Sequence, residues 1–209
     1  MAKISITEAL VKLKTLSKRI ESAIVTIRPI ALVTGKNFPT GFKSMEEFET
    51  AAKTAIQSAQ DLIKYRQTVK SAIVAANAVT IAIIGGKSLT VAQAIERKNS
   101  IGYEKELLKT LSQNYSATLK QQMQKEAEAE KRLDEQLAAI LGRDVKSRDA
   151  TEAEAQTKLF WDNNKPKLID PLNLKNLIET LEKDITEFEG EVDFRLSEAN
   201  AKTEIEVPE

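Results

Sequence analysis

A short motif that occurs twice limits the folds open to this chain. It consists of Ala-Asn-Ala followed by alternating β-branched residues, and it occurs at residues 76–81 and again at residues 199–205. Each copy follows a long stretch with helical periodicity and leads into a run of residues typical of a half-buried strand. Asn tolerates the left-handed backbone that ends many helices. We therefore expect each helix to end at Asn77 or Asn200 and to continue as a strand.

Apolar residues recur every three or four positions in three long segments, and each such set forms a stripe along one side of a helix. This spacing predicts long helices packed side by side at shallow angles. Five helix starts carry capping signals. They are Ser5, Ser44, Thr90 and Thr151, each followed three residues later by Glu or Gln, and Asp170-Pro171.

A glycine pair at 85–86 predicts a tight hairpin turn between strands at 79–84 and 87–89. With a third strand at 203–207, the expected fold is mainly α: a long-helix bundle or coiled coil with one small antiparallel sheet. We expect a single elongated domain over 1–209, with a charged helical arm at 117–142 and a linker at 143–150. The arm is most highly charged over 121–132, which predicts a helix there that is solvated or that pairs only loosely with a partner.

The composition excludes several classes of chemistry. The chain contains no Cys and no His, which rules out thiolate and histidine-based catalysis. Lys plus Arg equals Asp plus Glu at 31 each, so the net charge is zero. The charge balance therefore gives no reason to expect a nucleic acid polymer or a membrane as partner. We expect no enzyme activity, no catalytic residue, no cofactor and no metal site. Without a signal peptide or a membrane-spanning stretch, the expected location is the cytoplasm.

Basic residues interrupt the apolar stripes near the expected sheet. Arg66 and Arg195 replace apolar residues in two helices, and Lys98 lies in line with Ala94 and Ile101. Such cations could form a pocket for a phosphate-bearing ligand, helped by backbone amides of the glycine turn and of the next helix start. Two other interpretations are open: the side chains extend along apolar surface, or they pair with Glu96, Glu104, Asp193 or Glu198 on neighbouring helices. The candidate ligand-binding residues are Arg66, Gly86, Lys87, Thr90, Arg97, Lys98 and Arg195.

Three segments resemble a group of small uncharacterised proteins encoded by phages and prophages of Gram-positive bacteria. They are residues 1–20, 83–98 and 197–207, and they are also more distantly similar to the DIP1984-like bacterial helical proteins. The resemblance implies a phage accessory or virion-associated role. The predicted function is a non-enzymatic, homo-oligomeric binding protein that sequesters a small anionic, nucleotide-type immune signal in the host cytoplasm and so counteracts host defence. The alternative is a structural or assembly protein of the phage particle, located in the virion.

Overall fold

The computed structural model describes residues 2–141 and 150–208, with side chains for all of these except 140–141 and 150–152. It forms two compact units, one of residues 1–99 with 187–209 and one of residues 100–186. The mainly α class with small antiparallel strands is confirmed. The elements are β1 (Ala2–Ser5), α1 (Ile6–Thr26), α2 (Met45–Val79), β2 (Ile81–Ile84), β3 (Lys87–Thr90), α3 (Val91–Leu141), α4 (Ala150–Asn164), α5 (Leu174–Lys202) and β4 (Glu204–Val207).

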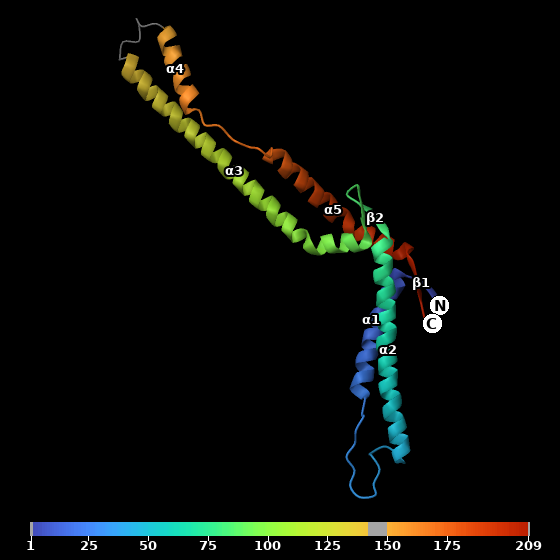
Figure 1. The fold of residues 1–209 in the computed structure, drawn as a ribbon. Coiled ribbons are helices and arrows are strands. Elements are labelled where there is room, and N and C mark those ends of the chain that lie inside the picture. The colour runs from blue at the N-terminus through green and yellow to red at the C-terminus, as the bar shows by residue number, and fades with distance from the viewer. Residues whose placement is uncertain (1, 142–149, 209) are drawn as a thin grey trace. The chain divides into compact units, whose positions relative to one another are not determined.

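The strands of the first unit form two separate two-stranded antiparallel sheets. β2 pairs with β3 as the expected hairpin, with Ile84 opposite Lys87. β4 does not join this hairpin, so the prediction of one three-stranded sheet is wrong. It pairs instead with β1, and Ala2 lies opposite Val207. The two ends of the chain therefore lie together (Figure 1). β1 carries too few residues for alternation to be visible in the sequence.

The two helix-to-strand junctions differ from the expectation in how the helix ends. Asn77 and Asn200 both lie inside their helices, and among the described residues Asn173 is the one non-glycine with a positive φ. Each helix instead ends with a backbone hydrogen bond that a threonine amide donates. The Thr80 amide donates to the Ala76 carbonyl and the Thr203 amide to the Ala199 carbonyl, both at 2.9 Å. The prediction that Asn stops the helix is therefore wrong, although the junctions lie where the motifs predict.

The similarity of the two copies extends beyond the motif to their partner strands. The Thr80 carbonyl accepts a hydrogen bond from the Val91 amide at 2.8 Å, and the Thr203 carbonyl accepts one from the Ile6 amide at 3.0 Å. In each case the donor is the first residue of a helix that directly follows a strand. The fold thus contains the same helix–strand, strand–helix unit twice. The turn at 85–86 connects one copy, whereas the other joins the two ends of the chain.

Side chains at equivalent positions in the two copies also make equivalent contacts. Ser5 and Thr90 each cap a helix, and each exchanges hydrogen bonds with the Glu or Gln three residues later. Lys12 Nζ lies 5.1 Å from the centre of the Tyr65 ring, and Arg97 Cζ lies 4.3 Å from the centre of the Phe188 ring. The first unit therefore contains an internal structural repeat.

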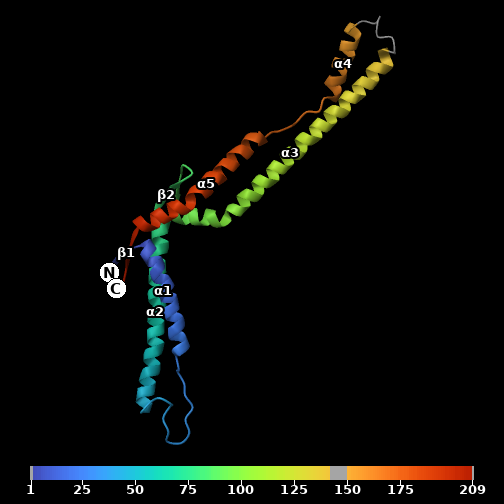
Figure 2. The ribbon, with the colours of Figure 1, turned by 180° about the vertical axis from the view of Figure 1, so that it is seen from behind.

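One core cluster of the first unit lies where α1 runs alongside α2 (Figures 1 and 2). The N-terminal half of the α1 stripe is buried there, as the three-four spacing predicts. Apolar residues of β4 complete this core by packing on the same helices. The buried cluster consists of Ile6, Ala9, Leu13, Val69, Ile73, Ile205 and Val207.

The second unit contains most of α3, all of α4 and the start of α5. Ala129 and Leu133 of α3 are buried against Phe160 of α4, and Trp161 packs on this cluster. The segment 121–132 is helical as expected, but it is not fully solvated because one of its faces meets α4. The predicted linker at 143–150 lies outside the described residues except for Ala150, which begins α4. The helix predicted from Pro171 begins at Leu174, whose amide donates to Asp170 at 2.7 Å.

Candidate functional site

The glycine turn between β2 and β3 has a side-chain partner from α5. Gly85 and Gly86 have φ values of 56° and 69°, which match the turn that a two-residue hairpin favours. The Gly85 amide donates a hydrogen bond to Glu191 Oε2 at 3.1 Å. A Cβ atom at Gly85 would lie 3.3 Å from the Glu187 Cβ atom, whereas Gly86 is open. One of the amides predicted to bind an anion therefore already binds a carboxylate.

Two predicted cations at the start of α3 contact the last part of α5. The Lys98 ammonium group forms an ion pair with Asp193. The Arg97 guanidinium group lies over the ring of Phe188. An arginine stacked on a buried ring gains cation–π attraction there. Both residues thus join α3 to α5 within the first unit.

Arg195 lies in a chain of charges on the last turns of α5. Its Nη1 atom donates to Glu198 Oε2 at 3.2 Å, and its Nε atom lies 3.8 Å from Glu191 Oε2. Lys202 Nζ donates to Glu198 Oε1 at 2.6 Å. Hydrogen bonds first from Lys202 and then from Arg195 stabilise the carboxylate and lower the pKa of Glu198 below its ordinary value of 4.5.

The other predicted residues lie at separate places in the fold. Arg66 Nε donates to Ser17 Oγ at 3.2 Å, so this arginine bridges α2 to α1. Thr90 Oγ1 accepts from the Gln93 amide at 3.1 Å and caps α3. Lys87 lies exposed at the start of β3. The structure therefore places Arg97, Lys98 and Arg195 around the end of α5, while Arg66 belongs to a different contact.

A shallow groove of about 300 Å³ separates β2 from the end of α5. Of the seven predicted residues, only Arg195 lines it. Lys202 and Glu198 line the same groove, so positive and negative groups are mixed along its wall. The lining residues are Thr80, Ile81, Ala82, Ile83, Arg195, Glu198, Ala199, Lys202 and Thr203.

The interpretation in which the cations pair with carboxylates describes Lys98 and Arg195. The sequence indicated Asp193 and Glu198 as partners on neighbouring helices. Lys98 pairs with Asp193 in this way, whereas Arg195 pairs with Glu198 on its own helix. Glu191 was missed, although it lies four residues before Arg195, a spacing that brings side chains together on a helix. The candidate site is consequently a network of ion pairs with one mixed-charge groove.

In comparisons with known proteins, no family model, no curated protein and no solved structure matches the chain. Within residues 2–141 and 150–208, no group of acidic side chains is arranged to hold a metal ion. No helix of the described chain is long and apolar enough to cross a membrane.

Acid is expected to weaken the charge network on α5. Because the folded-state pKa of Glu198 is lowered, its contribution to stability is present above pH 4.5 and is lost as the pH falls through the lowered value. The variant Glu198→Gln should therefore lose less stability below pH 4.5 than the original protein does. Urea unfolding measured at several pH values tests this. Lys202→Met removes the main cause of the shift and should act in the same direction, so an unchanged pH dependence in both variants would contradict the assignment.

Proposed function

We propose that the protein is a non-enzymatic structural or assembly protein that acts as a homo-oligomer, and that it serves a phage particle or its assembly. The phage context rests on the resemblance of residues 1–20, 83–98 and 197–207. The proposal of self-assembly rests on a single feature, an apolar side of the α1–α2 pair. The paired state of Lys98 and Arg195 favours this function over ligand capture, because those cations already have partners.

Two contacts between α1 and α2 define the two sides of this helix pair. Ser17 and Arg66 are joined by a hydrogen bond on one side. Lys12 and Tyr65 meet on the other side, where the ammonium group lies over the ring. Because residues seven apart lie on nearly the same side of a helix, each contact fixes the side to which its neighbours belong.

The side that carries Ser17 and Arg66 is rich in exposed aliphatic residues. Leu10 and Ile24 lie seven residues before and after Ser17. On α2, Ile63 lies three residues before Arg66, and Ile56 lies a further seven residues before it. All four side chains are exposed, and we call them the aliphatic side: Leu10, Ile24, Ile56 and Ile63.

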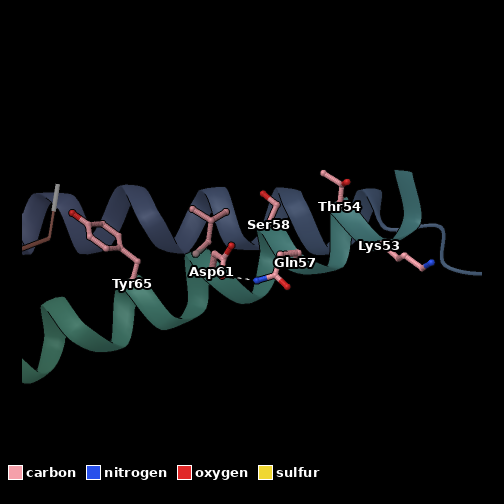
Figure 3. A pocket seen from close by; sticks show the side chains of 7 residues that line it. Lys53, Thr54, Gln57, Ser58, Asp61 and Tyr65 are labelled. Carbon is pink, nitrogen blue, oxygen red and sulfur yellow. Dashed lines mark hydrogen bonds between the residues drawn. The ribbon is translucent and has the colours of Figure 1, made fainter. Parts of the chain in front are cut away.

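The opposite side of the pair is polar. Figure 3 shows Thr54, Ser58 and Tyr65 along this part of α2, with Gln57 hydrogen-bonded to Asp61. These side chains line an open groove together with Lys53 and Leu62. A helix pair with one aliphatic side and one polar side is suited to form half of a four-helix bundle. A second copy offers the same aliphatic side, and a two-fold interface brings the same surface of both copies together.

Charge on the aliphatic side should prevent self-assembly. We expect the double variant Ile56→Glu/Ile63→Glu to lower the mass measured by light scattering after size-exclusion chromatography, because burying carboxylates in a bundle is strongly unfavourable. Ser58→Glu adds a carboxylate to the polar side of the same helix and should leave the mass unchanged. Equal masses for the original protein and the double variant across a wide concentration range would contradict the proposal.

A second candidate function, capture of a small anionic ligand, is favoured by one observation. Arg195 Nε is buried and has no hydrogen-bond partner within the described residues. A phosphate in the adjacent groove could accept from it, although it would compete with Glu198 and Glu191. This function predicts a higher melting temperature with cyclic dinucleotides or ADP-ribose derivatives, and loss of that increase in Arg195→Met. An unshifted melting curve over this panel excludes capture of those ligands.

A further inference from the structure

The internal repeat allows the outer face of β2 to be compared with an equivalent strand of the same protein. Ile81 and Ile83 of β2 occupy the positions that Glu204 and Glu206 occupy in β4, counted from the equivalent residues Thr80 and Thr203. The inward residues stay apolar in both strands, as the fold requires. The outward residues are isoleucine in one strand and glutamate in the other. Since β4 forms the same structure with glutamates, the fold itself does not require isoleucine at these two positions.

The isoleucines are exposed, with 57% of Ile81 and 60% of Ile83 accessible to solvent. Their backbone groups are also available. The Thr80 carbonyl bonds to Val91 of the neighbouring helix start, so the alternation of an antiparallel pair turns the amides and carbonyls of Ile81 and Ile83 away from β3. Within the described part of the chain, the structure gives these groups no hydrogen-bond partner. They lie along the groove between β2 and α5.

A free strand edge of this kind normally carries charge that discourages pairing. β4 follows that rule, because Glu204 and Glu206 would face each other if two β4 strands paired. β2 has no charged residue between 79 and 84. Of the two equivalent strands, β4 thus carries glutamates on its outward face, whereas β2 carries isoleucines there.

We infer that β2 pairs with β2 of a second copy of this chain, antiparallel and centred on Ala82. This inference rests on the proposed homo-oligomeric function and adds a second contact to it. In this register Ile81 lies opposite Ile83 of the partner subunit, and the outward-facing backbone groups of the two residues bond to each other. The cross-strand pairs are apolar on the exposed face. The outer edge of β2 is thus complementary to the same edge of another copy, so we take β2 of a second copy as its partner strand.

The first experiment replaces the isoleucines with the residues of the equivalent strand. Because β4 folds with glutamates, Ile81→Glu/Ile83→Glu should keep its helix content while losing the β2 contact. We expect sedimentation velocity to show larger species for the original protein than for this variant. The variant Ile56→Glu/Ile63→Glu should retain β2-linked dimers, and the combination of all four substitutions should be monomeric.

These variants distinguish assembly through the aliphatic side from pairing through β2. If the original protein assembles and Ile81→Glu/Ile83→Glu leaves its sedimentation unchanged, the β2 contact is wrong and the aliphatic side stands. If Ile56→Glu/Ile63→Glu leaves it unchanged while the β2 variant reduces it, the aliphatic side is wrong and the β2 contact stands. An original protein that is monomeric at every concentration overturns both.

The second experiment tests the register by cross-linking. The chain has no Cys, so each introduced thiol is unique. In the inferred register, a mixture of Ile81→Cys and Ile83→Cys chains places the two thiols opposite each other, whereas either variant alone places identical thiols on a longer diagonal. Mild oxidation of the mixture should give mainly the mixed dimer. Equal yields from the separate variants, or no dimer at concentrations where the original protein assembles, would overturn the register.

Discussion

Replacing Phe188 with alanine is expected to lower the free energy of unfolding by about 3–5 kcal/mol, the usual cost of removing a buried aromatic ring. Phe188 is 1% exposed, and the guanidinium group of Arg97 stacks over its ring. The loss would therefore combine a cavity in the core with an unstacked cation. Urea unfolding followed by circular dichroism measures the change.

Phe194 provides the matched control because it lies on the same helix and is 65% exposed. Phe194→Ala should change stability by about 1 kcal/mol or less, since it loses only a surface contact with Arg195. Similar losses in the two variants would show that the Phe188 ring is not part of a packed core.

The variant Ile73→Ala should cost about 2–5 kcal/mol. Ile73 is buried in the cluster that joins α1, α2 and β4, so its removal weakens three elements at once. The neighbouring residue Val74 is exposed, and Val74→Ala should lie within about 0.5 kcal/mol of the original protein. A small effect at Ile73, comparable with that at Val74, would contradict the packing of β4 on the helix pair.

Signals that act over a few residues predicted the fold well. The spacing of Ile6, Ala9 and Leu13 gave the correct buried face of α1, and Ser5, Ser44 and Thr90 cap helices as predicted. Such features depend on neighbours three or four residues away, so they are visible in one sequence. The start of α5 was misplaced because Asp170 bonds to Leu174 across a turn before the helix begins.

Contacts between distant residues were predicted less well. The pairing of Ala2 with Val207 could not be found, because a strand this short gives no periodic signal and its partner lies at the other end of the chain. Of the basic residues expected to converge beside one small sheet, Arg97, Lys98 and Arg195 contact or belong to the last part of α5, whereas Arg66 bridges α2 to α1. Their pairing with carboxylates depends on side-chain geometry, which spacing alone does not determine.

The repeated unit has a consequence for the order of folding. In one copy, Ile84 and Lys87 are separated by two glycines, so the hairpin can close within microseconds by a local search. In the other, Ala2 must find Val207 across nearly the whole polypeptide, a contact with a large loop-closure entropy. During synthesis β1 is made long before β4, so until β4 is made the apolar residues of α1 lack this packing partner. The two copies of the repeated unit thus share one structure but form at different stages of folding.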